Sequence, residues 1–101
     1  MTAVQTDNLA ELCHRHHVRR LALFGSYARG DATPPTSDRD FAVEFEPLAP
    51  VAHKTAYFGL LAGLEALFGC PIDLVERSAI RNPYVRARVE REAVDVYAAA
   101  A

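Results

Sequence analysis

Hydrophobic residues recur at helical spacing in three segments of the chain. Over 6–17 the spacing predicts an amphipathic helix, with Thr2 or Thr6 as its cap. A broader stripe of leucine and aromatic residues over 51–68 predicts the longest helix, and Gly69 follows it where a C-cap glycine belongs. Asn82 and Pro83 form an N-cap and first-turn pair, which predicts a last helix that runs to about residue 93.

Between these helices, apolar and β-branched residues predict strands over 18–24, 38–46 and 71–76, and a short edge strand over 94–97. A short helix is expected to begin at Ser26, and residues 31–37, rich in threonine and proline, predict a loop. Strands separated by helices, one of them a long crossover, indicate an α+β (α/β) fold with helices packed mainly on one face of a small mixed sheet. The chain of 101 residues fits one domain, 1–101, and has no room for a second substrate-binding lobe.

Charge and cysteine content exclude some classes of function. The net charge is -2, whereas a protein that grips long nucleic acid usually carries a basic excess, so long nucleic acid is not expected as a substrate. Cys13 and Cys70 form no metal-binding spacing, and both are expected to be reduced thiols of a cytoplasmic protein. No leader and no membrane-spanning segment is expected, because no apolar run has the required length.

Three aspartates are the candidate metal ligands. The two-residue period of a strand places Asp38 and Asp40 on one face, close enough for both carboxylates to bind the same hard cation. Asp73 is a lone aspartate in the apolar 71–76 strand, on the face opposite Ile72 and Leu74. For the Asp38 and Asp40 pair alone, an exposed acidic strand face remains the alternative. With Asp73 and a phosphate-binding turn, the three predict a site for metal-assisted phosphoryl transfer.

That turn is predicted at Gly25 and Ser26, where the first strand ends and a helix begins. Free backbone N–H groups and the positive end of the helix dipole can hold an anion there. Gly25 lets a phosphate approach the main chain, and the Ser26 hydroxyl can donate a further hydrogen bond. Arg29 follows on the same side of the helix, where it could reach a phosphate or hold the loop through Asp31.

Taken together, these motifs resemble the signature of the DNA-polymerase-β-like nucleotidyltransferase superfamily. The motifs are Gly25-Ser26-Tyr27-Ala28-Arg29-Gly30, which follows the strand predicted over 18–24, and Ser37-Asp38-Arg39-Asp40, which begins the strand predicted over 38–46. From Val18 to Tyr97 the chain is similar to the smallest branch of that superfamily, the minimal nucleotidyltransferases (MNT). The resemblance implies a polymerase-β palm-like nucleotidyltransferase fold. It also implies transfer of a nucleoside monophosphate, AMP from ATP, to an acceptor hydroxyl.

The same resemblance implies roles for six residues. Gly25, Ser26 and Arg29 would contact the triphosphate. Asp38 and Asp40 would bind two Mg²⁺ ions, and Asp73 would complete the second metal site and could accept the proton of the acceptor. Members of this branch are commonly antitoxins paired with a HEPN-domain toxin, and some adenylylate a tyrosine of that partner. The partner would then supply the acceptor surface that one small domain lacks.

Two other functions remain open at this stage. One is an antitoxin that neutralises its partner by binding alone, and the other is a nucleotidyltransferase that modifies an antibiotic hydroxyl. The lack of a second lobe counts against the latter.

Some features depart from the family pattern or extend beyond it. Eleven residues separate Ser26 from Asp38, one more than is usual in the branch, and Arg39 replaces an aliphatic residue. The broad apolar surface of the 51–68 helix leaves open a homo- or hetero-oligomer. The alternating charges of the last helix, Arg88 and Glu92 among them, predict an exposed salt-bridged face.

Overall fold

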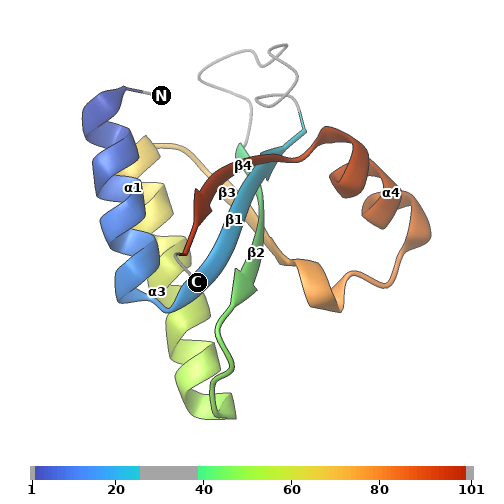
Figure 1. Ribbon diagram of the computed structural model, residues 1–101, viewed down its shortest axis with the longest axis horizontal. Coiled ribbons are helices and arrows are strands. Elements are labelled where there is room, and N and C mark those ends of the chain that lie inside the picture. The colour runs from blue at the N-terminus through green and yellow to red at the C-terminus, as the bar shows by residue number, and fades with distance from the viewer. Residues whose placement is uncertain (1, 26–38, 100–101) are drawn as a thin grey trace.

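The computed structural model describes residues 2–25 and 39–99. These residues form three helices, a short 3₁₀ helix and a four-stranded mixed sheet, an α+β arrangement that confirms the predicted fold class (Figure 1). In chain order the elements are α1 (Ala3–Arg15), β1 (Val18–Phe24), β2 (Arg39–Phe45), α3 (Pro50–Phe68), β3 (Ile72–Glu76), the 3₁₀ helix (Arg77–Ala79), α4 (Pro83–Glu92) and β4 (Val94–Ala98).

The helix ends follow the capping signals of the sequence. Thr2 caps α1 through a capping box with Gln5, so the helix begins earlier than the apolar spacing indicates. Gly69 ends α3 in the left-handed conformation with φ 64°, which glycine adopts without strain. The side chain of Asn82 accepts hydrogen bonds from the backbone of α4, 2.9 Å from the nitrogen of Tyr84. The three helices predicted over 6–17, 51–68 and 83–93 are confirmed, whereas the short helix expected from Ser26 and the loop expected over 31–37 lie outside the described residues.

The sheet has the strand order β3-β2-β1-β4. β1 pairs antiparallel with β2 and with β4, whereas β2 and β3 run parallel. Parallel neighbours need a crossover connection, and α3 provides it between β2 and β3. The predicted edge strand is longer than expected, since β4 reaches Ala98 and the next residue, Ala99, donates to the carbonyl of Arg19 at 2.8 Å.

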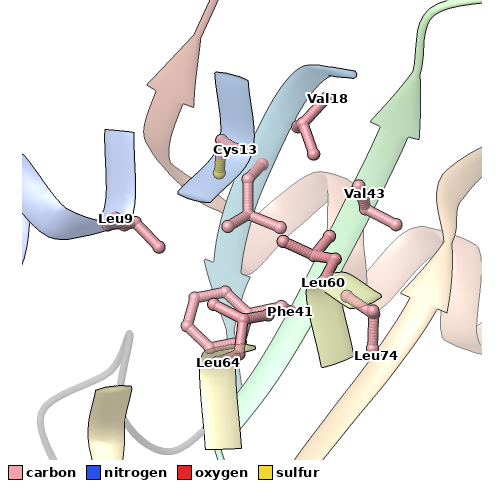
Figure 2. Packing of buried hydrophobic residues seen from close by; sticks show 9 residues of the cluster. Leu9, Cys13, Val18, Phe41, Val43, Leu60, Leu64 and Leu74 are labelled. Atoms are coloured by element: carbon pink, nitrogen blue, oxygen red, sulfur yellow. The ribbon is translucent and has the colours of Figure 1, made fainter. Parts of the chain in front are cut away.

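Helices cover both faces of this sheet unequally. α1 and α3 lie side by side on one face, and α4 lies alone against the other (Figure 1). The larger core, drawn in Figure 2, lies under α1 and α3 and comprises Leu9, Cys13, Val18, Leu21, Phe41, Val43, Leu60, Leu64 and Leu74. The smaller core lies under α4 and comprises Phe24, Ala42, Ile80 and Val89.

Arg39 fits into the strand despite its charge. Its guanidinium carbon lies 4.4 Å from the centre of the Phe68 ring, so the long side chain covers the aromatic ring at the end of α3. The strand keeps its alternation, because Phe41 and Val43 are buried in the larger core. The unusual residue between the two aspartates therefore does not shift β2.

Both cysteines are free thiols. Cys13 lies on the buried side of α1, and burial raises the pKa of its thiol to about 12, so this residue stays protonated and unreactive at neutral pH. Cys70 is half-buried. Within residues 2–25 and 39–99, no helix combines the length and the apolar character needed to cross a membrane.

The larger core should dominate stability. We expect Leu64→Ala, which removes a fully buried side chain, to lower the free energy of unfolding by about 2–5 kcal/mol in urea denaturation. Val51→Ala on the same helix changes a side chain that is 80% exposed and should cost no more than about 0.5 kcal/mol. Equal losses for the two variants would contradict the assignment of this core.

Candidate functional site

Asp40 and Asp73 are neighbours on the sheet. They are direct partners in the parallel pairing of β2 with β3, and residues that lie opposite each other in a sheet share a face. Phe41 and Leu74, the next residues on each strand, point into the core under α1 and α3. The two carboxylates therefore lie on the opposite face, the one that α4 partly covers. The side chain of Asp40 is 18% exposed, while Asp73, on the edge strand, is exposed.

The structure thus brings together two of the three carboxylates singled out in the sequence. The other candidate residues, Ser26, Arg29 and Asp38, lie outside the described residues, and their placement stays a prediction.

Gly25 packs directly against Asp40. Phe24 pairs with Asp40 across β1 and β2, and the chain then turns at Gly25 with φ 76°, in the left-handed region. A methyl group at residue 25 would overlap Oδ2 of Asp40 and would lie 3.1 Å from an amino nitrogen of Arg88. Both the backbone conformation and the close approach of the carboxylate require glycine here. Gly25, which the sequence predicts to lie against a phosphate, thus also packs against Asp40, a candidate metal ligand.

Two residues of α4, Glu92 and Arg88, lie next to Gly25 and Asp40. Oε1 of Glu92 accepts the backbone N–H of Gly25 at 3.2 Å. The same oxygen lies 3.5 Å from Nε of Arg88, and an amino nitrogen of Arg88 lies 3.8 Å from Oδ2 of Asp40. The Arg88 guanidinium also lies 5.5 Å from the centre of the Phe24 ring. α4 therefore contacts both Gly25, where the turn begins, and the carboxylate of Asp40.

The predicted salt bridge on α4 is confirmed for Arg88 and Glu92, whose Nε and Oε1 atoms lie 3.5 Å apart, but the predicted exposure is wrong, above all for Glu92. Their side chains are 43% and 13% exposed, because they flank Val89, which packs onto Phe24 and Ala42. The sequence contained a signal for this arrangement, since residues four apart lie on one side of a helix and Val89 stands between them.

Tyr57 holds the strand that carries Asp73. Its hydroxyl donates to the carbonyl of Leu74 at 2.6 Å, which ties α3 to β3 next to the aspartate. Burial is the main cause that raises the pKa of Tyr57 above its ordinary value, and the negative charges of Glu76 and Asp73 raise it further. The hydroxyl therefore remains a donor at neutral pH.

A hollow of about 500 Å³ lies elsewhere. Its lining includes His53, Tyr57 and Glu76, and Glu76 is on the same side of β3 as Leu74, facing α3. The sheet therefore separates this hollow from the face that carries Asp40 and Asp73, so the hollow is not part of the candidate metal site.

The donor set fits a hard divalent cation. Carboxylate oxygens are the ligands that Mg²⁺ takes from proteins, usually together with phosphate oxygens and water. Among the described residues, no group of three or more histidine, cysteine, aspartate or glutamate side chains gathers closely enough to enclose an ion. Asp40 and Asp73 are two candidate ligands on one face of the sheet, an arrangement that suits an ion shared with a phosphate-bearing substrate.

Comparison with known proteins gives matches over most of the chain. Residues 8–96 match the family model described as Nucleotidyltransferase domain. The protein adenylyltransferase MntA of Thermococcus cleftensis is 36% identical over 94 residues, which cover 93% of this chain and 90% of that protein. MJ1379 of Methanocaldococcus jannaschii, provisionally named a protein adenylyltransferase, is 38% identical over 82 residues, which cover 81% of this chain and 80% of that protein.

Solved structures share the fold. One, provisionally described as a minimal nucleotidyltransferase, is 34% identical and superposes with a TM-score of 0.73 over 90% of this chain and 88% of that chain. Another, described as a toxin-antitoxin with AMP-PNP, has a TM-score of 0.71 at 21% identity and covers 93% of this chain and 73% of that chain. At that identity the likeness shows the fold.

Two glycines with positive φ give a matched test of the Gly25 contact. Gly69→Ala places a methyl group in open space, so only the left-handed backbone opposes it, at about 1–2 kcal/mol. Gly25→Ala has the same backbone cost and also displaces Asp40, which should add about 1–3 kcal/mol. Urea denaturation of both variants measures the difference, and equal losses would contradict the close packing of Asp40 on Gly25.

Proposed function

The chain belongs to the nucleotidyltransferase domain family, and on that premise we propose that it transfers AMP from ATP to a tyrosine hydroxyl of a partner HEPN-domain toxin, with Mg²⁺, and is the antitoxin of that toxin. The observation that carries the proposal is the register of β2 and β3, in which Asp73 stands beside Asp40 on one face. Two carboxylates on one face can hold the divalent cation that metal-assisted transfer of a phosphoryl group uses.

The relatives support a protein as the acceptor. This chain covers most of the length of relatives that are named protein adenylyltransferases, so they too are small proteins. A structure with the same fold is described as a toxin-antitoxin with AMP-PNP, an analogue of ATP. A toxin partner would bring both the acceptor hydroxyl and a surface that places this hydroxyl beside the carboxylates.

The position of Asp73 supports an acceptor on a second molecule. Asp73 is exposed on an edge strand, whereas Asp40 is enclosed by Gly25 and Arg88. An acceptor can therefore approach along β3, on the side of the site away from β1 and α4. Its hydroxyl oxygen attacks the α-phosphorus of ATP, pyrophosphate leaves, and Asp73 accepts the hydroxyl proton.

The remaining residues position the nucleotide. The N–H of Gly25 donates to Glu92, so the triphosphate would be bound by the residues that follow Gly25 in the predicted turn, with Ser26 as its hydroxyl donor. Asp38, Asp40 and Asp73 would hold Mg²⁺, which would supply charge neutralisation at the phosphate oxygens. The protein itself contributes orientation and a preformed electrostatic field rather than a covalent intermediate.

The test is the mass of the partner after incubation with the protein, MgCl₂ and ATP. We expect the partner to gain one or more AMP groups. Asp40→Asn and Asp73→Asn keep the shape of the side chain and remove its charge, and each should slow the transfer by about 100-fold or more without unfolding the domain. Circular dichroism checks the fold of each variant.

Glu44→Gln is the matched control, because Glu44 lies further along β2 and forms an exposed pair with Arg20 at 3.9 Å. It should keep nearly the full rate. A wild-type rate in Asp73→Asn would contradict the proposed site. A partner that is silenced without any gain of mass would identify an antitoxin that acts by binding alone.

A further inference from the structure

Arg88 brings a positive charge to the carboxylate face. It reaches the site from α4, and its amino nitrogen lies 3.8 Å from Oδ2 of Asp40. An arginine side chain is charged at every physiological pH, so this charge is permanent. It stands beside a carboxylate that has a second carboxylate, Asp73, as its neighbour on the sheet. Two carboxylates side by side repel each other unless a cation lies close by.

The distance between Arg88 and Asp40 separates two possible roles. At 3.8 Å the pair is within ion-pairing range but longer than a direct charge-assisted hydrogen bond, which measures about 2.7–2.9 Å. A bidentate arginine would occupy the oxygen atoms that a metal ion needs. At the observed distance, Arg88 lowers the repulsion electrostatically.

Two contacts keep the guanidinium at this distance. Oε1 of Glu92 lies 3.5 Å from its Nε atom, and the ring of Phe24 lies 5.5 Å from its central carbon. Glu92 is itself fixed, since it accepts the backbone N–H of Gly25 and its side chain is only 13% exposed. The guanidinium is thus held by α4 and β1 rather than by Asp40.

We propose that Arg88 is a positioning residue, a resident counter-ion that holds Asp40 ready before a divalent cation binds, and that Glu92 keeps the Arg88 guanidinium from taking the ligand positions of that carboxylate. This inference rests on the proposed function, because it takes Asp40 as a metal ligand. When Mg²⁺ binds, its charge replaces the contribution of Arg88 at Asp40, so Arg88 stabilises the metal-free protein more than the loaded one.

The test compares thermal unfolding with and without saturating Mg²⁺ and a non-hydrolysable ATP analogue at constant ionic strength. Arg88→Met should lower the melting temperature of the metal-free protein by about 2–6 °C, as expected for loss of one partly exposed ion pair in a small domain. With Mg²⁺ and the analogue most of that loss should disappear. Arg88→Lys should restore the metal-free value in part, because it restores the charge.

Arg91→Met is the control on the same helix, at an exposed position, and should respond to Mg²⁺ and the analogue as the wild type does. Arg88→Gln provides a second neutral variant. A merely structural role of Arg88 would lower the melting temperature equally in both conditions, and that result would overturn the inference alone. A wild-type protein that gains no stability from Mg²⁺ and the analogue would overturn the proposed function as well.

Discussion

The site depends on the contact between Asp40 and the backbone at Gly25. Oδ2 of Asp40 occupies the space that any side chain at residue 25 would need, and the main chain leaves β1 there in a conformation that favours glycine. The turn expected to hold phosphate and the carboxylate expected to hold metal are therefore one packed unit. Glu92 fixes this unit from the outside by accepting the N–H of Gly25. We therefore expect a change at any of these residues to disturb the contacts of the others.

The position of Asp73 beside Asp40 follows from the fold and not from the residues next to it in the sequence. Asp73 stands beside Asp40 because β2 and β3 pair in parallel, and a parallel pair requires the α3 crossover. α3 is held by the larger core, where Leu60 and Leu64 are fully buried, and by the hydrogen bond from Tyr57 to Leu74. The apolar face of the sheet thereby sets the position of an acidic group on the opposite face.

Local periodicity predicted most of the elements and the face on which Asp40 and Asp73 lie. The alternation along β2 and β3 places Asp40 and Asp73 on the face opposite Phe41 and Leu74, as the structure has it. The register between the strands could not be read from the sequence, because it follows from how α3 packs. Arg88 and Glu92 were missed for a related reason. Which side of α4 faces the sheet depends on Val85 and Val89, and charged residues on a helix are typical of a solvated surface. For Ser26, Arg29 and Asp38 the sequence remains the basis of the assignment.

The most direct measurement is a crystal structure of the protein with Mn²⁺ and a non-hydrolysable ATP analogue, in which anomalous scattering locates the metal. The account predicts an ion about 2.0–2.3 Å from carboxylate oxygens of both Asp40 and Asp73, with the triphosphate at the turn that begins at Gly25. An ion bound without Asp73, or a nucleotide bound away from Gly25, would contradict it.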